Sequence, residues 1–153
     1  LIPGLEQHIE NLDEIKKMIE HDLVIDKTEL DLESLKTPQL HNKYLIFLME
    51  EKLLLAKQEG DFKQLRKRKW LYYTGKMSQE ELDYHNYEPF QLNVLKQDIE
   101  KFIESDDEIV ELSHKITYQK EKVDYLEGVV KMINNRQWLI RSAIDWIKFT
   151  NGS

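Results

Sequence analysis

The sequence contains no cysteine, and this absence excludes several kinds of protein. Without a thiol there is no disulfide framework, no cysteine nucleophile and no thiolate metal site. No stretch reaches the roughly 20 apolar residues that a transmembrane helix requires. The amino terminus also lacks the basic and then apolar pattern of a secretion signal. We therefore expect a protein that is neither exported nor inserted in a membrane.

Glycine and proline are scarce as well, with five and three residues among 153. These residues interrupt helices, and runs of β-branched residues, which favour strands, are also few. The chain is long enough for one domain with a modest core and too short for two independent ones. The expected fold class is therefore all-α.

The first half of the chain is expected to form an N-terminal helical region over residues 11–97, with residues 1–10 as an extension or cloning remnant. Thr37 and Pro38 are typical of a helix start, because threonine can cap a helix and proline at its first position loses no needed donor. An apolar stripe then predicts one long helix, which Gly75 closes in the left-handed conformation.

Short helices are expected on either side of this long one. Apolar residues at steps of three and four predict a helix that ends near His21. Ser78 and Glu81 have the spacing of a capping box and predict another. Residues 86–97 are interpreted as a connector.

Residues 98–150 are expected to form a long C-terminal helix, which begins near Asp98 or at the capping-box pair of Ser105 and Glu108. Its apolar residues alternate at steps of three and four, as in the seam of a coiled coil. We call this set the seam: Ile109, Leu112, Ile116, Val123, Leu126, Val130, Ile133, Ile140, Ile144 and Ile147. Gln119 and Gln137 are its polar members.

A second apolar stripe follows the same helix, roughly 130° away around the helix axis. It comprises Tyr118, Tyr125, Met132, Leu139 and Trp146, and we call it the second stripe. A helix over residues 109–147 is roughly 60 Å long, whereas a compact chain of this size has a radius of gyration of about 15 Å. We therefore expect an elongated protein that self-associates through residues 109–149. The alternative is a single core stripe with surface aromatics.

Signatures of catalysis and of ligand binding are missing from the sequence. Gly75-Lys76 lacks the rest of a phosphate-binding loop. The five histidines are scattered, and none pairs with a recognisable nucleophile or metal motif. We expect no enzyme activity, no metal and no cofactor.

One basic segment, residues 63–77, stands out from an acidic chain. It carries six cations and no carboxylate, while the whole chain has a net charge of −7. Its cations and aromatic rings are Lys63, Arg66, Lys67, Arg68, Lys69, Lys76, Trp70, Tyr72 and Tyr73. Cations neutralise phosphates and flat rings stack on unpaired bases, so the segment is typical of a site for single-stranded nucleic acid.

An alternative reading places the rings in the core and the cations against an acidic helix, such as the one with Asp106, Asp107 and Glu108. In addition, Lys67 and Lys69 lie about 160° apart on an ideal helix. One strand does not easily touch both, unless the helix loosens near Gly75 or neighbouring subunits share the surface.

The basic run that ends in Tyr72-Tyr73-Thr74-Gly75 resembles the signature of the UvsY recombination mediators of T-even-type phages and their relatives that infect cyanobacteria. Further pieces of the sequence, on both sides of this run, resemble the family in the same order along the chain over residues 11–150. They are Val24-Ile25-Asp26, Pro38-Gln39-Leu40-His41, Lys43-Tyr44, the connector around Lys96 to Asp98, and Trp146 to Phe149.

This resemblance implies a non-enzymatic protein in the cytoplasm of the infected bacterial host. It implies binding to single-stranded DNA, to the phage recombinase and to the phage single-strand-binding protein. It also implies that the protein helps to load the recombinase onto DNA covered by that single-strand-binding protein. The rival hypothesis is a coiled-coil scaffold whose basic segment docks an acidic protein partner.

The resemblance also assigns residues. Two basic residues that the family ties to DNA binding correspond to Lys67 and Lys69. We extend the predicted DNA-binding set, within residues 11–97, to Arg66, Arg68, Lys63, Tyr72, Tyr73 and Lys76. Residues 98–150 then form the oligomerisation helix of a ring of about six or seven subunits, through the seam together with Tyr125 and Trp146.

Overall fold

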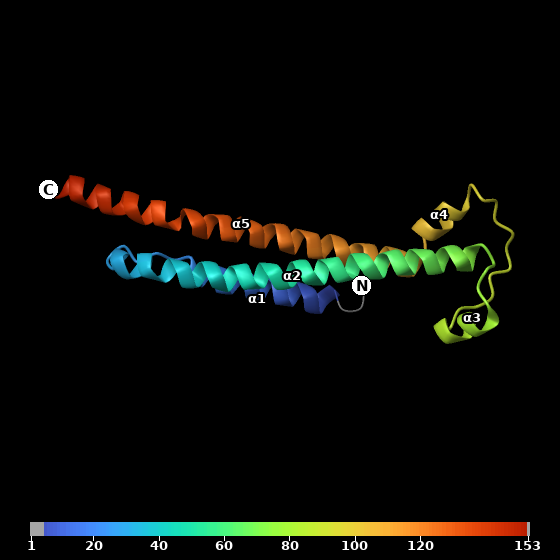
Figure 1. The fold of residues 1–153 in the computed structure, drawn as a ribbon. Coiled ribbons are helices and arrows are strands. Elements are labelled where there is room, and N and C mark those ends of the chain that lie inside the picture. The colour runs from blue at the N-terminus through green and yellow to red at the C-terminus, as the bar shows by residue number, and fades with distance from the viewer. Residues whose placement is uncertain (1–4, 153) are drawn as a thin grey trace. The chain divides into compact units, whose positions relative to one another are not determined.

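The computed structural model describes residues 5–152, and their side chains from residue 12 onward. The regular secondary structure of this part of the chain is entirely helical (Figure 1). They are α1 (Leu5–Asp22), α2 (Leu30–Tyr73), α3 (Gln79–His85), α4 (Ile99–Glu104) and α5 (Asp107–Thr150). The predicted all-α class is confirmed, and residues 1–4 of the expected extension lie outside the described residues. No helix among residues 5–152 combines the length and apolarity needed to cross a membrane.

The contacts divide the chain into two compact units. Unit 1 comprises Leu1–Leu53 and Gln119–Ser153, and unit 2 comprises Leu54–Tyr118. Helices α2 and α5 therefore contribute one part to each unit. The predicted DNA-binding residues all fall in unit 2.

Helix α2 begins eight residues before the predicted start at Pro38, so that prediction is wrong. Its entry is fixed by a turn in which Asp26 accepts hydrogen bonds from the Thr28 amide at 2.8 Å and from the Thr28 hydroxyl at 2.6 Å. Leu30 is then buried in unit 1. Proline removes one backbone hydrogen bond inside a helix, and the burial of Leu30, Glu33 and Thr37 in these two additional turns offsets that loss.

Three capping residues were predicted for the helix ends of unit 2, at Gly75, Ser78 and Ser105, and the first two are confirmed. Gly75 adopts a φ of 68° after α2. The Ser78 hydroxyl accepts from the Glu81 amide at 3.2 Å, and the Glu81 carboxylate accepts from the Ser78 amide at 2.8 Å. This reciprocal pair confirms the capping box of α3.

The predicted capping box at Ser105 is wrong, because Asp106 caps α5 instead. Its carboxylate accepts from the Glu108 amide at 3.0 Å and from the Ile109 amide at 3.4 Å. The Ser105 hydroxyl turns back and donates to the carbonyl of Lys101 at 2.7 Å. Serine and aspartate both cap helices well, so adjacent residues compete for this position.

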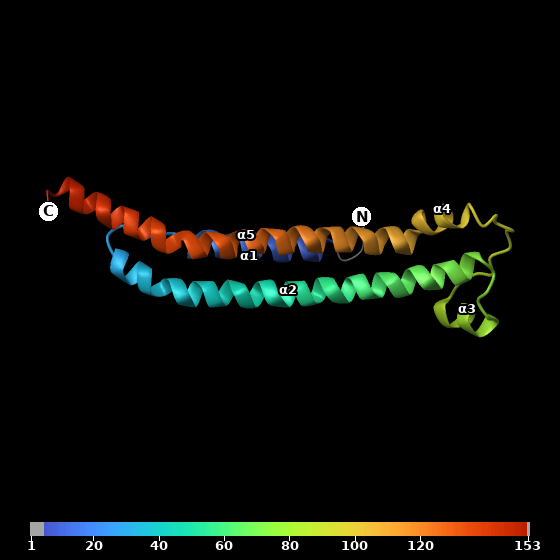
Figure 2. The same cartoon turned by 45° about the horizontal axis from the view of Figure 1, so that its top comes forward.

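Unit 1 is a bundle of α1, the first part of α2 and the last part of α5 (Figure 2). Tyr44 and Leu126 are fully enclosed, and Ile133 is as well. The Tyr44 hydroxyl donates to Asp22 at 2.7 Å and so joins α2 to α1. Within unit 1 the seam of α5 packs against this chain's own helices, and Val123, for example, is 5% exposed.

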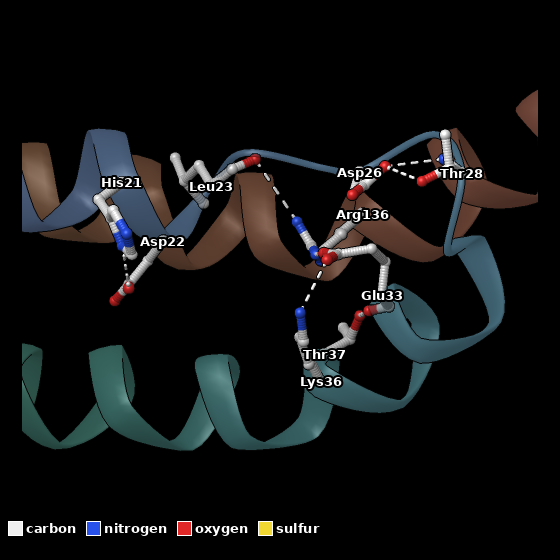
Figure 3. A network of polar contacts seen from close by, with 9 residues as sticks. All are labelled: His21, Asp22, Leu23, Asp26, Thr28, Glu33, Lys36, Thr37 and Arg136. Carbon is white, nitrogen blue, oxygen red and sulfur yellow. Dashed lines mark hydrogen bonds and ion pairs between the residues drawn. The ribbon is translucent and has the colours of Figure 1, made fainter.

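Two buried polar residues of α5 bind glutamates of α2. Gln119 donates to the backbone and side-chain oxygens of Glu51, at 2.9 and 2.5 Å. Arg136 forms an ion pair with Glu33, and its guanidinium also donates to the Leu23 carbonyl at 3.5 Å (Figure 3). Gln137, which we expected in the seam, is exposed, and Arg136 is buried in its place.

The ion pair of Arg136 and Glu33 is buried on both sides within unit 1. We expect Glu33→Ala to lower the free energy of unfolding by about 3 kcal/mol or more, because it leaves a buried guanidinium without a partner. Lys36 lies at the surface, and its ammonium donates to the same Glu33 carboxylate at a distance of 2.8 Å. Lys36→Ala is therefore the matched control, with a much smaller expected loss. Urea unfolding of both variants measures the difference, and equal losses would contradict the assignment.

Candidate nucleic-acid interface

The last three turns of α2 carry three exposed side chains on one face of the helix. Lys63, Lys67 and Trp70 fall within about 60° of one another around an ideal helix. Both lysines are exposed, and Trp70 is 39% exposed. Within the described part of the chain neither lysine forms an ion pair. We call these three residues the basic stripe.

An apolar cluster on the opposite side holds this part of α2 in place. Leu65 packs with Ile99 and Ile103 of α4 and with Ile109 of α5, and all four are buried. Because these contacts fix the rotation of the helix about its axis, they also decide which cations face outward.

Lys69, which we predicted to bind DNA together with Lys67, lies on the packed side of α2 and is buried. Its ammonium is 3.0 Å from the carboxylate of Asp106 and 2.5 Å from that of Glu108. It also lies 4.2 Å from the centre of the Tyr87 ring. The alternative reading, in which cations of the segment face acidic residues at the start of α5, therefore describes Lys69 correctly.

Two tyrosines complete the surroundings of Lys69. The Tyr73 hydroxyl donates to Asp106 at 2.6 Å, and the Tyr87 hydroxyl donates to Glu108 at 2.5 Å. We call these five residues the Lys69 cluster. Each carboxylate thus accepts a hydroxyl hydrogen bond in addition to its contact with the ammonium.

Protonation equilibria in the Lys69 cluster favour its charged form. Burial alone raises the pKa of Asp106, but hydrogen bonds from Tyr73 and Lys69 outweigh it and hold that pKa below its usual value. The pKa of Glu108 is lowered in the same way, by Lys69 and Tyr87 against burial. Because folding lowers both values, the resulting stability is present above their unfolded pKa values and is lost as the pH falls through the folded ones.

The other predicted DNA-binding residues divide between these two sides. Arg66 pairs with Glu100 of α4, and Arg68 is half-buried. The Tyr72 hydroxyl donates to the Glu88 carbonyl at 2.7 Å, so this ring supports the connector. Lys76 is exposed, and its ammonium lies 4.4 Å from the centre of the Trp70 ring.

A cavity of about 560 Å³ adjoins the basic stripe in unit 2. The end of α2 and residues 90–96 of the connector line it, and Trp70 and Lys76 stand at its wall. Sequence reasoning noted Trp70 only as one of three rings. The pattern that distinguishes it is its spacing of three from Lys67 and seven from Lys63, which puts it on their face of the helix.

Comparison with known proteins assigns the chain to a family. A family model described as "Recombination, repair and ssDNA binding protein UvsY" matches residues 18–153. The chain belongs to the UvsY family. The resemblance seen in the sequence is thereby confirmed, and at the family level the chain is a recombination mediator of a family described by recombination, repair and single-stranded DNA binding.

The UvsY protein of phage T4 is distant from this chain in sequence and close to it in fold. The chain is 22% identical to the recombination protein uvsY of Enterobacteria phage T4 over 141 residues, which are 92% of this chain and 98% of that protein. It also matches crystal structures of the bacteriophage T4 recombination mediator protein UvsY. Lattice type II has a TM-score of 0.75 at 21% identity and covers 92% of this chain and 97% of that one. For lattice type IV the values are 0.74, 19%, 91% and 98%.

The two sides of α2 are separable by a matched pair of substitutions. We expect Lys69→Met to lower the free energy of unfolding by about 3 kcal/mol, because the Asp106 side chain, which is 8% exposed, and the half-exposed Glu108 lose their cation. Lys67→Met removes the same charge from an exposed position, and we expect a change within about 0.5 kcal/mol. Urea unfolding at neutral pH measures both, and similar losses for the two variants would refute this division.

Proposed function

We propose that this UvsY family member binds single-stranded DNA through the basic stripe and helps to load a phage recombinase onto DNA covered by single-strand-binding protein. The observation that carries the proposal is the alignment of Lys63, Lys67 and Trp70 on one exposed face of α2. Two cations for phosphates and one ring for a base are the groups that a flexible strand requires. Lys76, beside Trp70, adds a third exposed cation.

Electrostatics makes each such site weak on its own. The basic segment carries six cations, but the rest of the chain is strongly acidic and the net charge is −7. Lys69 and Arg66 are also neutralised by carboxylates within the chain. Few contacts to phosphate remain per chain, so strong binding requires several chains acting on one strand.

The second stripe of α5 is the surface that we propose for assembly. In unit 1 the exposed fractions of Met132, Leu139 and Trp146 are 53%, 57% and 65%. The seam residues from Val123 to Ile140 are instead covered by this chain. This burial is the physical reason for moving the proposed oligomer contacts from the seam to the second stripe. A large exposed apolar surface on a soluble chain marks an interaction site.

Weak single contacts also suit a protein that must release its strand. A mediator passes DNA from a single-strand-binding protein to a recombinase. Its own contacts with the DNA must therefore be able to dissociate one after another. Multivalent binding meets both needs, because later contacts are intramolecular while each remains reversible. The proposed partners are therefore single-stranded DNA, the phage recombinase, the phage single-strand-binding protein and further copies of this chain.

The salt dependence of DNA binding tests the basic stripe. Each phosphate contact on a single strand contributes about −0.7 to the slope of log K against log salt. We therefore expect Lys63→Ala with Lys67→Ala to flatten the slope by about 1.4 per chain engaged and to weaken binding. Fluorescence anisotropy with a labelled oligonucleotide across a salt series measures it.

The control removes two exposed lysines elsewhere, Lys17→Ala with Lys27→Ala in unit 1. It lowers the net charge equally, and we expect its slope to match that of the unchanged protein. Equal flattening in both variants would reject the stripe as the contact site. Failure of the unchanged protein to bind any oligonucleotide, together with binding to an acidic protein, would favour the scaffold hypothesis.

Charged substitutions on the second stripe test assembly. We expect Met132→Asp with Leu139→Asp to dissociate the oligomer, because burying two carboxylates at an interface is unfavourable. Both side chains are exposed within the chain, so helix content should be retained. Sedimentation velocity measures the assembly and circular dichroism the helix content.

The matched control adds two charges to the opposite face of α5, by Asn134→Asp with Gln137→Glu. These residues are exposed and lie about 160° around the helix from Met132 and Leu139 respectively. We expect a full-size assembly. Dissociation by the control, or an intact oligomer in the stripe variant, would contradict the proposed surface.

A further inference from the structure

The cavity beside the basic stripe has the size and the lining of a site for a small planar ligand. Its volume is about 560 Å³, within the range of pockets that bind small molecules. It is lined by the end of α2, including Trp70, and by the connector, including Phe90, whose ring also packs against Tyr73. Both belong to unit 2.

Three kinds of group surround this space. Trp70 and Phe90 supply ring surfaces, Lys76 and Lys96 supply cations, and the connector supplies the amides of Gln91 and Asn93. Rings stack on nucleobases, amides pair with base edges as both donors and acceptors, and ammonium groups neutralise phosphates. The combination fits a nucleotide better than an apolar ligand, which needs neither charges nor amides.

The cavity also lies where a bound strand passes. Trp70 belongs to both the basic stripe and the cavity wall. Along the helix axis it is roughly 4.5 Å from Lys67 and roughly 10 Å from Lys63. A strand whose phosphates contact the two lysines therefore reaches Trp70 within one or two nucleotides.

The connector leaves backbone groups free to meet a base. Residues 90–94 belong to no helix in the described structure, and their amides and carbonyls form no backbone hydrogen bond there. Tyr72 holds this segment at a fixed place through its hydrogen bond to the Glu88 carbonyl. The connector side of the cavity is therefore held in place by Tyr72 and carries polar backbone groups.

We propose that the cavity receives an unpaired nucleobase of the bound strand, stacked on Trp70. This deepens the proposed function and rests on it. The ammonium of Lys76 now lies 4.4 Å from the centre of the Trp70 ring. On binding, the base replaces this cation on the ring, and the flexible lysine moves to the adjoining phosphate.

A base bound in the cavity loses its stacking contacts with the neighbouring bases of the strand. Bases paired in a duplex are unavailable without an unstacking cost of a few kcal/mol, so the cavity selects single strands over duplex. It also interrupts the stacking of the strand at each chain of the assembly. The consequence is a strand that is held partly unstacked and extended.

The test compares a short oligothymidylate with an abasic strand of equal length and charge. We expect the unchanged full-length protein to prefer the strand with bases by about fivefold or more, as stacking on one ring provides. Trp70→Ala should remove this preference, and Trp70→Phe should keep part of it. Competition anisotropy at one fixed salt concentration measures all three.

Tyr84→Ala is the matched control, since Tyr84 is an 82% exposed ring of α3 in the same unit and does not line the cavity. We expect it to keep the full preference. Equal affinity of the unchanged protein for both strands would overturn the base site and leave the proposed DNA binding intact. Binding to neither strand would instead reject the proposed function.

A second measurement guards against a folding defect in the tryptophan variants. Photocrosslinking of the unchanged protein to an oligonucleotide with 5-iodouracil should attach the base within the peptides that contain Trp70 or Phe90. Crosslinks confined to other peptides would overturn the proposal. So would a Trp70→Ala variant that loses affinity equally for both strands, because that result assigns Trp70 a role in phosphate contacts or folding.

Discussion

A lysine enclosed by two carboxylates fixes the end of α2 in unit 2, and the candidate interface depends on that contact. Lys69 bridges Asp106 and Glu108, and Tyr73 and Tyr87 satisfy the remaining acceptors. A buried charge that is fully paired is costly to break, so the helix cannot rotate about its axis without losing the cluster. Its opposite face is therefore held toward solvent.

The same distribution of charge explains how an acidic chain can bind an acidic polymer. Internal carboxylates neutralise part of the basic segment, and only a narrow stripe and the cations at the cavity remain for phosphates. We expect the proposed site to discriminate by shape and stacking more than by charge, because a few cations against a net charge of −7 give little unspecific attraction. In the proposed assembly, copies of the site would supply the affinity that one copy lacks.

Local signals and long-range contacts contributed differently to what could be predicted. The capping box at Ser78 and the left-handed Gly75 depend on neighbouring residues alone, and both were predictable. The start of α2 was not, because Leu30 and Glu33 gain their burial from packing within unit 1. Arg136 illustrates the limit: its burial requires Glu33, which lies 103 residues away in the chain, and no local pattern reveals that partner.

The sequence by itself determined the all-α class, the two apolar stripes of α5 and the sorting of cations into residues 63–77. These follow from periodicity and composition, which act over a few helical turns. Only the tertiary structure decided which stripe the chain covers and which cations it buries. Lys67 and Lys69 are alike as isolated residues, and they differ because packing on Leu65 turns one toward solvent and the other toward Asp106.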